Sequence, residues 1–154
     1  MEHEQFNYPE SIRYLANKYN IEIIETVETS DNIEERNERE SLFIINNFAS
    51  SYFQDILLEK EEINKYLLDR GLSLTTIKNF NLGYSTDSKN NFYKKANENG
   101  YSDKYLEETG LVITIDNKKI DRFRERIIFP IKSIAGRVLG FGGRILDSNK
   151  KIAK

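Results

Sequence analysis

Two apolar runs in the last third of the chain constrain the fold most, because only a short turn separates them. The runs cover residues 127–131 and 138–146, and the predicted turn lies at Ala135 and Gly136. Apolar runs of this length on either side of a glycine-containing turn are typical of a β-hairpin. We therefore expect an antiparallel two-stranded ribbon near the carboxyl end.

Arginines precede this hairpin at alternate positions, namely Arg122, Arg124 and Arg126. Alternate side chains of a strand lie on the same face, so three guanidinium groups share one face if residues 122–126 continue the first strand. Such groups repel one another unless an anion lies among them, and a phosphate backbone is the commonest such anion. A solvated strand edge, whose charges discourage aggregation, explains the spacing equally well.

The charge of the chain is distributed unevenly. The formal net charge is −2, but residues 118–154 hold eleven Lys and Arg against three Asp and Glu. The remaining residues hold twelve Lys and Arg against twenty-two Asp and Glu. A mild average can therefore contain a strongly basic face, as a nucleic-acid footprint requires.

Three glycines in the second run of the hairpin need a separate explanation. Gly140, Gly142 and Gly143 stand before Arg144 and a strand-like Ile-Leu pair, with no helix start behind them. A phosphate-binding loop needs a helix N-terminus at that point, so the pattern excludes Rossmann and P-loop sites. It favours a β-bulge, or a bend where another backbone approaches closely, over direct contact with a ligand.

Helices are predicted upstream of these strands. An apolar stripe indicates a long helix over about residues 34–58, with Asp31 or Asn32 as its N-cap. Further predicted elements are helices at 61–70 (ended by Gly71), 74–80 (capped by Ser73, closed by Gly83), 92–99 and 103–109 (capped by Ser102), and a strand at 111–115. Helices followed by strands predict an α+β fold with an antiparallel sheet.

Several kinds of chemistry are excluded by composition. The chain has no cysteine, and its single histidine, His3, lies near the amino end, so thiolate zinc sites and Ser-His-Asp catalysis are not expected. Asp121 and Glu125 lie in the basic stretch and are expected to pair with arginine rather than hold Mg²⁺. No run approaches the ~18 apolar residues of a membrane span, which fits a cytoplasmic protein.

Three parts of the chain together resemble a known family. Residues 121–131 and 136–144, ending in Phe-Gly-Gly-Arg, are similar to the N-terminal subdomain of the RNA-polymerase core in bacterial DnaG-type DNA primases. Residues 66–72 and 77–84 resemble the helical segment upstream in that subdomain, and residues 8–23 resemble the tail of the preceding zinc-binding domain. The resemblance implies a zinc-domain tail at 1–24, an acidic linker at 25–40 and the core subdomain at 41–154.

The resemblance also implies what this stretch of chain lacks. Family members carry zinc ligands near the start and an acidic toprim module that binds Mg²⁺ or Mn²⁺, with a Glu and an Asp-x-Asp. No cysteine and no Asp-x-Asp occur here. We therefore expect a fragment without a complete active site, and Zn²⁺ and Mg²⁺ or Mn²⁺ as cofactors of the full-length protein only.

Function and partners follow from the same resemblance. The full protein would make RNA primers from NTPs on single-stranded DNA at the bacterial replication fork, in the cytoplasm, and meet the replicative helicase through a missing C-terminal domain. Basic positions that line the template groove in the family match Arg70, Arg122, Arg124, Arg144 and Lys154. Phe123, Phe129 and Phe141 are expected in the core rather than as base-stacking platforms. The alternative is a protein-interaction or scaffold module whose basic strand meets an acidic partner.

Overall fold

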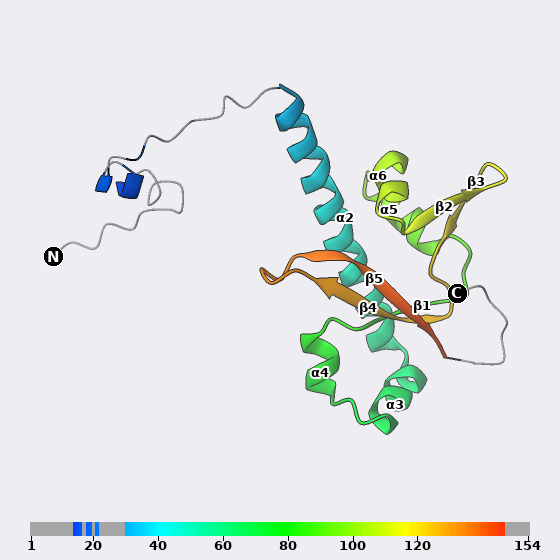
Figure 1. Ribbon diagram of the computed structural model, residues 1–154. Coiled ribbons are helices and arrows are strands. Elements are labelled where there is room, and N and C mark those ends of the chain that lie inside the picture. The colour runs from blue at the N-terminus through cyan, green and yellow to red at the C-terminus, as the bar shows by residue number, and fades with distance from the viewer. Residues whose placement is uncertain (1–13, 17, 20, 22–29, 147–154) are drawn as a thin grey trace. The chain divides into compact units, whose positions relative to one another are not determined.

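A computed structural model describes residues 14–16, 18, 19, 21 and 30–146 (Figure 1). The chain divides into two units, Met1–Glu34 and Glu35–Lys154. In the first, residues 14–16, 18 and 19 are helical, and Ala16 is buried whereas Leu15 and Tyr19 are exposed. His3, most of the predicted zinc-domain tail and Lys154 lie outside the described residues. No helix in the described ranges has the length and apolar character that crossing a membrane would require.

The long helix α2 (Ser30–Glu59) begins earlier than its apolar stripe predicted. Asn32 and Asp31 lie within its first turn, so the prediction that either residue precedes the helix as N-cap is wrong. The expected linker is helical from Ser30 onward because residues 34–40 are mostly Glu and Arg, which are good helix formers. Glu35 and Arg39 are also spaced four apart, the spacing at which opposite charges support a helix.

Two short helices follow, α3 (Glu61–Asp69) and α4 (Leu74–Asn79). Gly71, with φ +87°, ends α3 as predicted, and the Leu72 N–H donates back to the Leu67 carbonyl at 3.1 Å. The Ser73 hydroxyl accepts the Thr76 N–H at 3.0 Å and so caps α4.

The prediction that Gly83 closes α4 is wrong. Asn81, at φ 53°, adopts the left-handed conformation after this helix, whereas Gly83 is the first residue of strand β1 (Gly83–Ser85). At Gly83 the strand crosses α2 so closely that an added Cβ would lie 2.5 Å from the Cβ of Phe53. This glycine is therefore required by packing rather than by a helix end.

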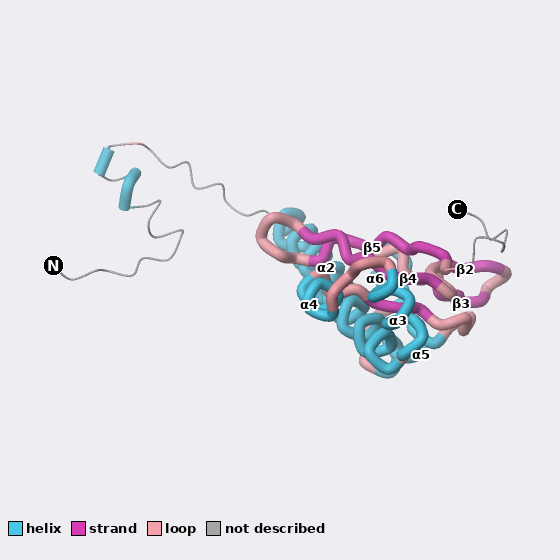
Figure 2. The backbone as a smooth tube through the Cα atoms, turned by 90° about the horizontal axis from the view of Figure 1, so that it is seen from below, coloured by secondary structure: helices cyan, strands magenta, loops and turns pink. Residues whose placement is uncertain are grey.

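The predicted hairpin is confirmed as β4 (Arg126–Lys132) and β5 (Val138–Ile145), with the turn at Gly136 (φ 81°). Strand β1 pairs with the other edge of β4, giving the antiparallel order β1-β4-β5. Figure 2 labels β4 and β5 of this sheet. A second antiparallel pair joins β2 (Val112–Ile115) to β3 (Lys118–Asp121). Helices and small antiparallel sheets together confirm the α+β class.

A bulge interrupts the hairpin where glycines were expected to produce one. Ile131 pairs with Gly140 but Lys132 pairs with Val138, so Leu139 is an extra residue in β5. The Leu139 carbonyl accepts a bond from the amide nitrogen of Asn46 on α2, at 3.3 Å. The bulge thereby fixes the start of β5 against the long helix.

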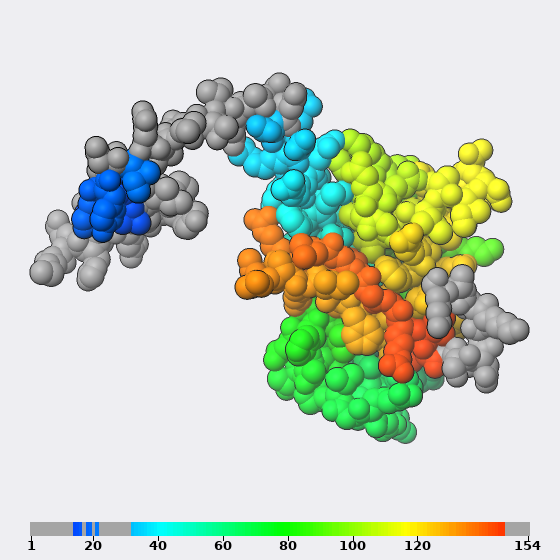
Figure 3. Space-filling model, in the orientation of Figure 1, coloured from blue at the N-terminus to red at the C-terminus, as the bar shows by residue number. Residues whose placement is uncertain are grey.

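Strand β4 is buried on both faces. Ile128 packs into a cluster built from α2 and from helices α5 (Asn91–Glu98) and α6 (Asp103–Glu108), whereas Ile127 packs into a second cluster with α3 and α4. The first cluster also receives Phe123 and Phe141, and the second receives Phe129. The predicted core role of the three phenylalanines is therefore confirmed. Figure 3 shows the hairpin, in orange and red, between helices α3 and α4 (green) and the part of the chain that holds α5, α6, β2 and β3 (yellow-green to yellow).

Candidate nucleic-acid interface

The loop that carries the first arginines, residues 122–125, is not a strand. Glu125 has φ 52°, a left-handed conformation that breaks the extended backbone, so the expected continuous strand over residues 122–126 is wrong. The loop leaves one sheet and enters the other, and its N–H groups bond elsewhere. Arg122 donates to the Leu111 carbonyl at 2.9 Å, and Glu125 donates to the Thr86 carbonyl at 3.1 Å.

The arginines nevertheless converge on one place. A cavity of about 120 Å³ is lined by Arg122, Arg124 and Arg126, together with Asp87 from the loop between β1 and α5. Arg122 is exposed, and the other two arginines are half-buried. Because a water molecule occupies about 30 Å³ in the liquid, the cavity has room for a group the size of a phosphate.

Close packing over two glycines holds the arginine side chains in position. The Arg122 guanidinium lies over Gly110, with Nη1 3.5 Å from where an added Cβ would stand. The Phe123 ring and the aliphatic stem of Arg126 lie across Gly143. Their nearest atoms are 2.7 and 3.1 Å from where an added Cβ would stand on Gly143. The predicted close approach thus occurs at Gly143, but the neighbours there are side chains rather than a second backbone.

Asp121, at the end of β3, ties the arginine loop to a helix. Its carboxylate oxygens accept the backbone N–H groups of Phe92 at 2.9 Å and Tyr93 at 3.0 Å, in the first turn of α5. The bonds give α5 the acceptor that its own N-cap residue, Asn90, does not supply through its side chain. The prediction that Asp121 chiefly pairs with arginine is therefore corrected.

Burial raises the pKa of the Asp121 carboxyl, although the N–H groups of Tyr93 and Phe92 and the charge of Arg124 oppose the rise. A raised folded-state pKa means that this group stabilises the fold fully below its unfolded pKa, about 3.9, and loses that contribution as pH rises through the folded value. We expect the unfolding free energy of the wild type, relative to Asp121→Asn, to fall between about pH 3.5 and neutrality. Urea titrations of both proteins across this range measure it, and a difference that grew with pH would contradict the prediction.

The other predicted contacts that the structure describes, Arg70 and Arg144, do not line this cavity. Arg70 follows α3 and stacks on Tyr66, with its guanidinium carbon 5.0 Å from the ring centre. Arg144 pairs with Ile127, so it lies on the face of the sheet that α3 and α4 cover, opposite to the Arg126 face. Lys154 lies outside the described residues. The structure thus groups Arg122 and Arg124 with Arg126.

Sequence reasoning left two lining residues out of the predicted contacts. Arg126 has the same alternate spacing as Arg122 and Arg124, and this spacing indicates that it lies with them. Asp87 carried no signal, because the loop between β1 and α5 reaches the cavity only through the tertiary fold.

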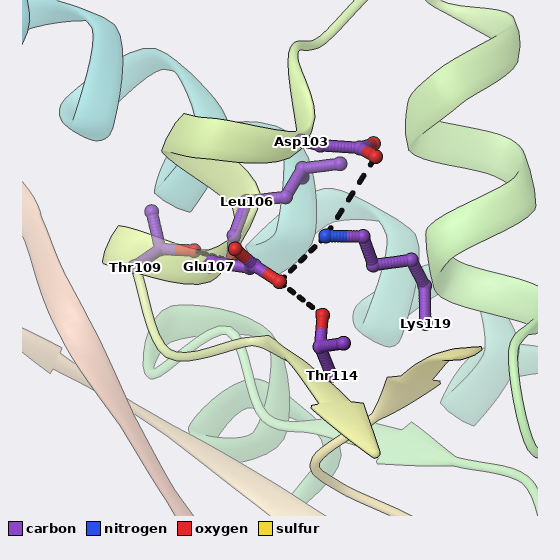
Figure 4. Close-up of polar contacts among 6 residues, drawn as sticks. All are labelled: Asp103, Leu106, Glu107, Thr109, Thr114 and Lys119. Carbon is purple, nitrogen blue, oxygen red and sulfur yellow. Dashed lines mark hydrogen bonds and ion pairs between the residues drawn. The ribbon is translucent and has the colours of Figure 1, made fainter. Parts of the chain in front are cut away.

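Two other basic residues of the carboxyl-terminal third, Arg137 and Lys119, have acidic partners. Arg137 contacts Glu40 on α2 at 3.0 Å. Lys119 on β3 donates to Glu107 on α6 at 2.6 Å and lies 3.7 Å from Asp103, as Figure 4 shows. Ion pairs at the surface contribute little stability, but the two pairs of Lys119 orient β3, the strand that leads into the arginine loop.

The Glu107 carboxylate joins α6 to the β2–β3 hairpin. It accepts hydrogen bonds from Lys119 and from the Thr114 hydroxyl, and these bonds lower the pKa of Glu107 (Figure 4). Within the described ranges, no group of three or more His, Cys, Asp or Glu is placed to hold a metal ion. The described residues therefore do not fit a catalytic metal centre.

Comparison with known proteins identifies the family. Residues 52–154 match the model of the DNA primase catalytic core, N-terminal domain. The chain belongs to the DNA primase family. It is 36% identical to the DNA primase of Clostridium acetobutylicum over 152 residues, covering 97% of this chain and 25% of that protein. It is 30% identical to the DNA primase of Escherichia coli over 152 residues, again covering 97% of this chain and 26% of that protein. The chain thus spans about a quarter of the length of these primases.

Solved primase structures share the fold. A DnaG primase catalytic domain bound to ssDNA matches with a TM-score of 0.69 and 32% identity, covering 75% of this chain and 38% of that one. The Aquifex aeolicus primase, comprising zinc-binding and RNA polymerase domains, matches with a TM-score of 0.68 and 27% identity, covering 97% of this chain and 35% of that one.

Proposed function

We propose that this chain is the N-terminal part of a primase polymerase core, and that it holds single-stranded template DNA through the cavity of Arg122, Arg124 and Arg126. The convergence of three guanidinium groups around about 120 Å³ carries the proposal. It is supported by a related primase catalytic domain that has been described bound to ssDNA.

The chemistry of the cavity suits a phosphate backbone. A guanidinium group is planar, always charged at neutral pH and able to bind two phosphate oxygens at once. The nearby phenylalanines are half-buried and pack against the two cores, so we assign them a packing role rather than base stacking. Recognition by charge alone predicts binding that is independent of base sequence and sensitive to salt.

The rest of the activity belongs to the whole protein. We propose that the full primase synthesises RNA primers from NTPs during bacterial replication in the cytoplasm, with Mg²⁺ or Mn²⁺ and Zn²⁺ bound by segments outside this chain. A replicative helicase would be met through another domain. Arg70 and Arg144, which lie outside the arginine cavity, are proposed as further template contacts, and so is Lys154.

Competition between two polyanions tests the proposal against the scaffold alternative. A fluorescent oligonucleotide of about 16 nucleotides, bound to the chain at low salt, is displaced by unlabelled oligonucleotide or by polyglutamate of equal total charge. We expect the unlabelled oligonucleotide to displace the fluorescent one at a concentration at least about tenfold lower than polyglutamate does, because phosphates match the planar guanidinium group. Equal displacement would favour the acidic protein partner, and absence of any binding at low salt would overturn the template role.

A further inference from the structure

Asp87 is an acid among arginines, and the backbone holds it there. It lies between Thr86, whose carbonyl accepts the Glu125 N–H at 3.1 Å, and Lys89, whose carbonyl accepts the Asp121 N–H at 2.7 Å. The chain on either side of Asp87 is therefore bonded to the arginine loop or to Asp121, the residue directly before that loop. This double attachment keeps the carboxylate at the wall of the cavity.

The Asp87 carboxylate is not used to position the arginines. It is exposed, and it makes no hydrogen bond or ion pair with any residue in the described part of the chain. By contrast, the neighbouring acid Asp121 is buried and accepts two backbone N–H groups. The charge of Asp87 is thus available to act on whatever enters the cavity.

Its effect on a ligand depends on the charge of that ligand. Coulomb repulsion grows in proportion to ligand charge, so a carboxylate opposes a polyphosphate more than it opposes one backbone phosphodiester. Three arginines alone would bind free pyrophosphate and triphosphate more tightly than a single diester linkage, because these ions carry more negative charge. An acid among the arginines corrects that preference without removing the attraction for a strand.

We propose that Asp87 is a specificity-determining residue, which keeps free polyphosphates out of the arginine cavity so that single-stranded DNA can occupy it. This inference rests on the proposed template role and adds a selectivity to the same site. The ligand it admits is a singly charged phosphodiester, and the competitors it opposes are pyrophosphate and triphosphate groups.

Replacing the carboxylate by its neutral isostere, Asp87→Asn, tests the inference. Binding of the labelled oligonucleotide is measured by anisotropy, and displacement by inorganic pyrophosphate is measured in the same solutions. We expect oligonucleotide affinity to rise about threefold and pyrophosphate affinity to rise about tenfold or more, because the removed repulsion scales with charge. Both gains should shrink at about 1 M salt, where the screening length is about 3 Å.

Asp116→Asn is the matched control, because it removes the same charge from the exposed β2–β3 turn, where the left-handed φ of 48° also suits asparagine. It should change neither affinity by more than about twofold. An unchanged ratio of pyrophosphate to oligonucleotide affinity in Asp87→Asn, or an equal change in Asp116→Asn, would overturn the inference while leaving the template role intact. Failure of the template role would instead appear in the wild type, as oligonucleotide binding that is absent.

Discussion

Gly83→Ala is expected to destabilise the fold by about 3 kcal/mol, near the upper end of the usual cost of overpacking a core. The added Cβ would stand 2.5 Å from the Cβ of Phe53 and 2.8 Å from its carbonyl carbon. A helix backbone cannot yield as a flexible side chain can, and Phe53 is also part of the buried cluster around α2. Urea denaturation should show a lower midpoint with an unchanged slope.

Gly140→Ala is the control for this substitution. Both glycines lie in strands of the same sheet, but an added Cβ at Gly140 meets nothing within 4 Å. The change in unfolding free energy should stay within about 0.5 kcal/mol. Equal destabilisation by the two alanines would show that the crossing of β1 over α2 is not what requires glycine at Gly83.

Gly83 also illustrates which features a sequence can predict. The hairpin of β4 and β5 was predictable because its two strands and its turn are contiguous, so the local pattern contains the whole motif. The role of Gly83 depends on Phe53, thirty residues earlier in the sequence. A local pattern contains only the preceding helix α4, and it therefore suggested a helix end.

The arginine cavity shows a similar division. The alternate spacing predicted correctly that Arg122, Arg124 and Arg126 meet, although they meet through a loop with a left-handed Glu125 rather than through strand alternation. Asp87 reaches the cavity from a separate loop, and this placement depends on tertiary contacts that no nearby residue signals.

Removing two charges from the cavity is expected to have the largest effect on binding. Arg122→Gln/Arg124→Gln should weaken oligonucleotide affinity at low salt by about 100-fold or more, because each charge-assisted hydrogen bond contributes about 1.5 kcal/mol or more. Lys60→Gln/Lys65→Gln removes two exposed charges, one at the N-cap and one in the middle of α3, and should weaken binding less than about threefold. Circular dichroism and urea midpoints should show that both variants remain folded. Equal loss in the two variants would mean that overall charge, rather than the cavity, attracts DNA.

The salt dependence of binding tests most directly whether these guanidinium groups contact phosphates. Oligonucleotide affinity is measured between about 50 and 200 mM salt for the wild type and for Arg122→Gln/Arg124→Gln. Each phosphate contact on a single strand adds about 0.7 to the slope of log affinity against log salt, so the variant should be shallower by about 1.4. A variant that bound more weakly but kept the wild-type slope would show that the arginines shape the protein without touching the strand, and would contradict the proposed template site.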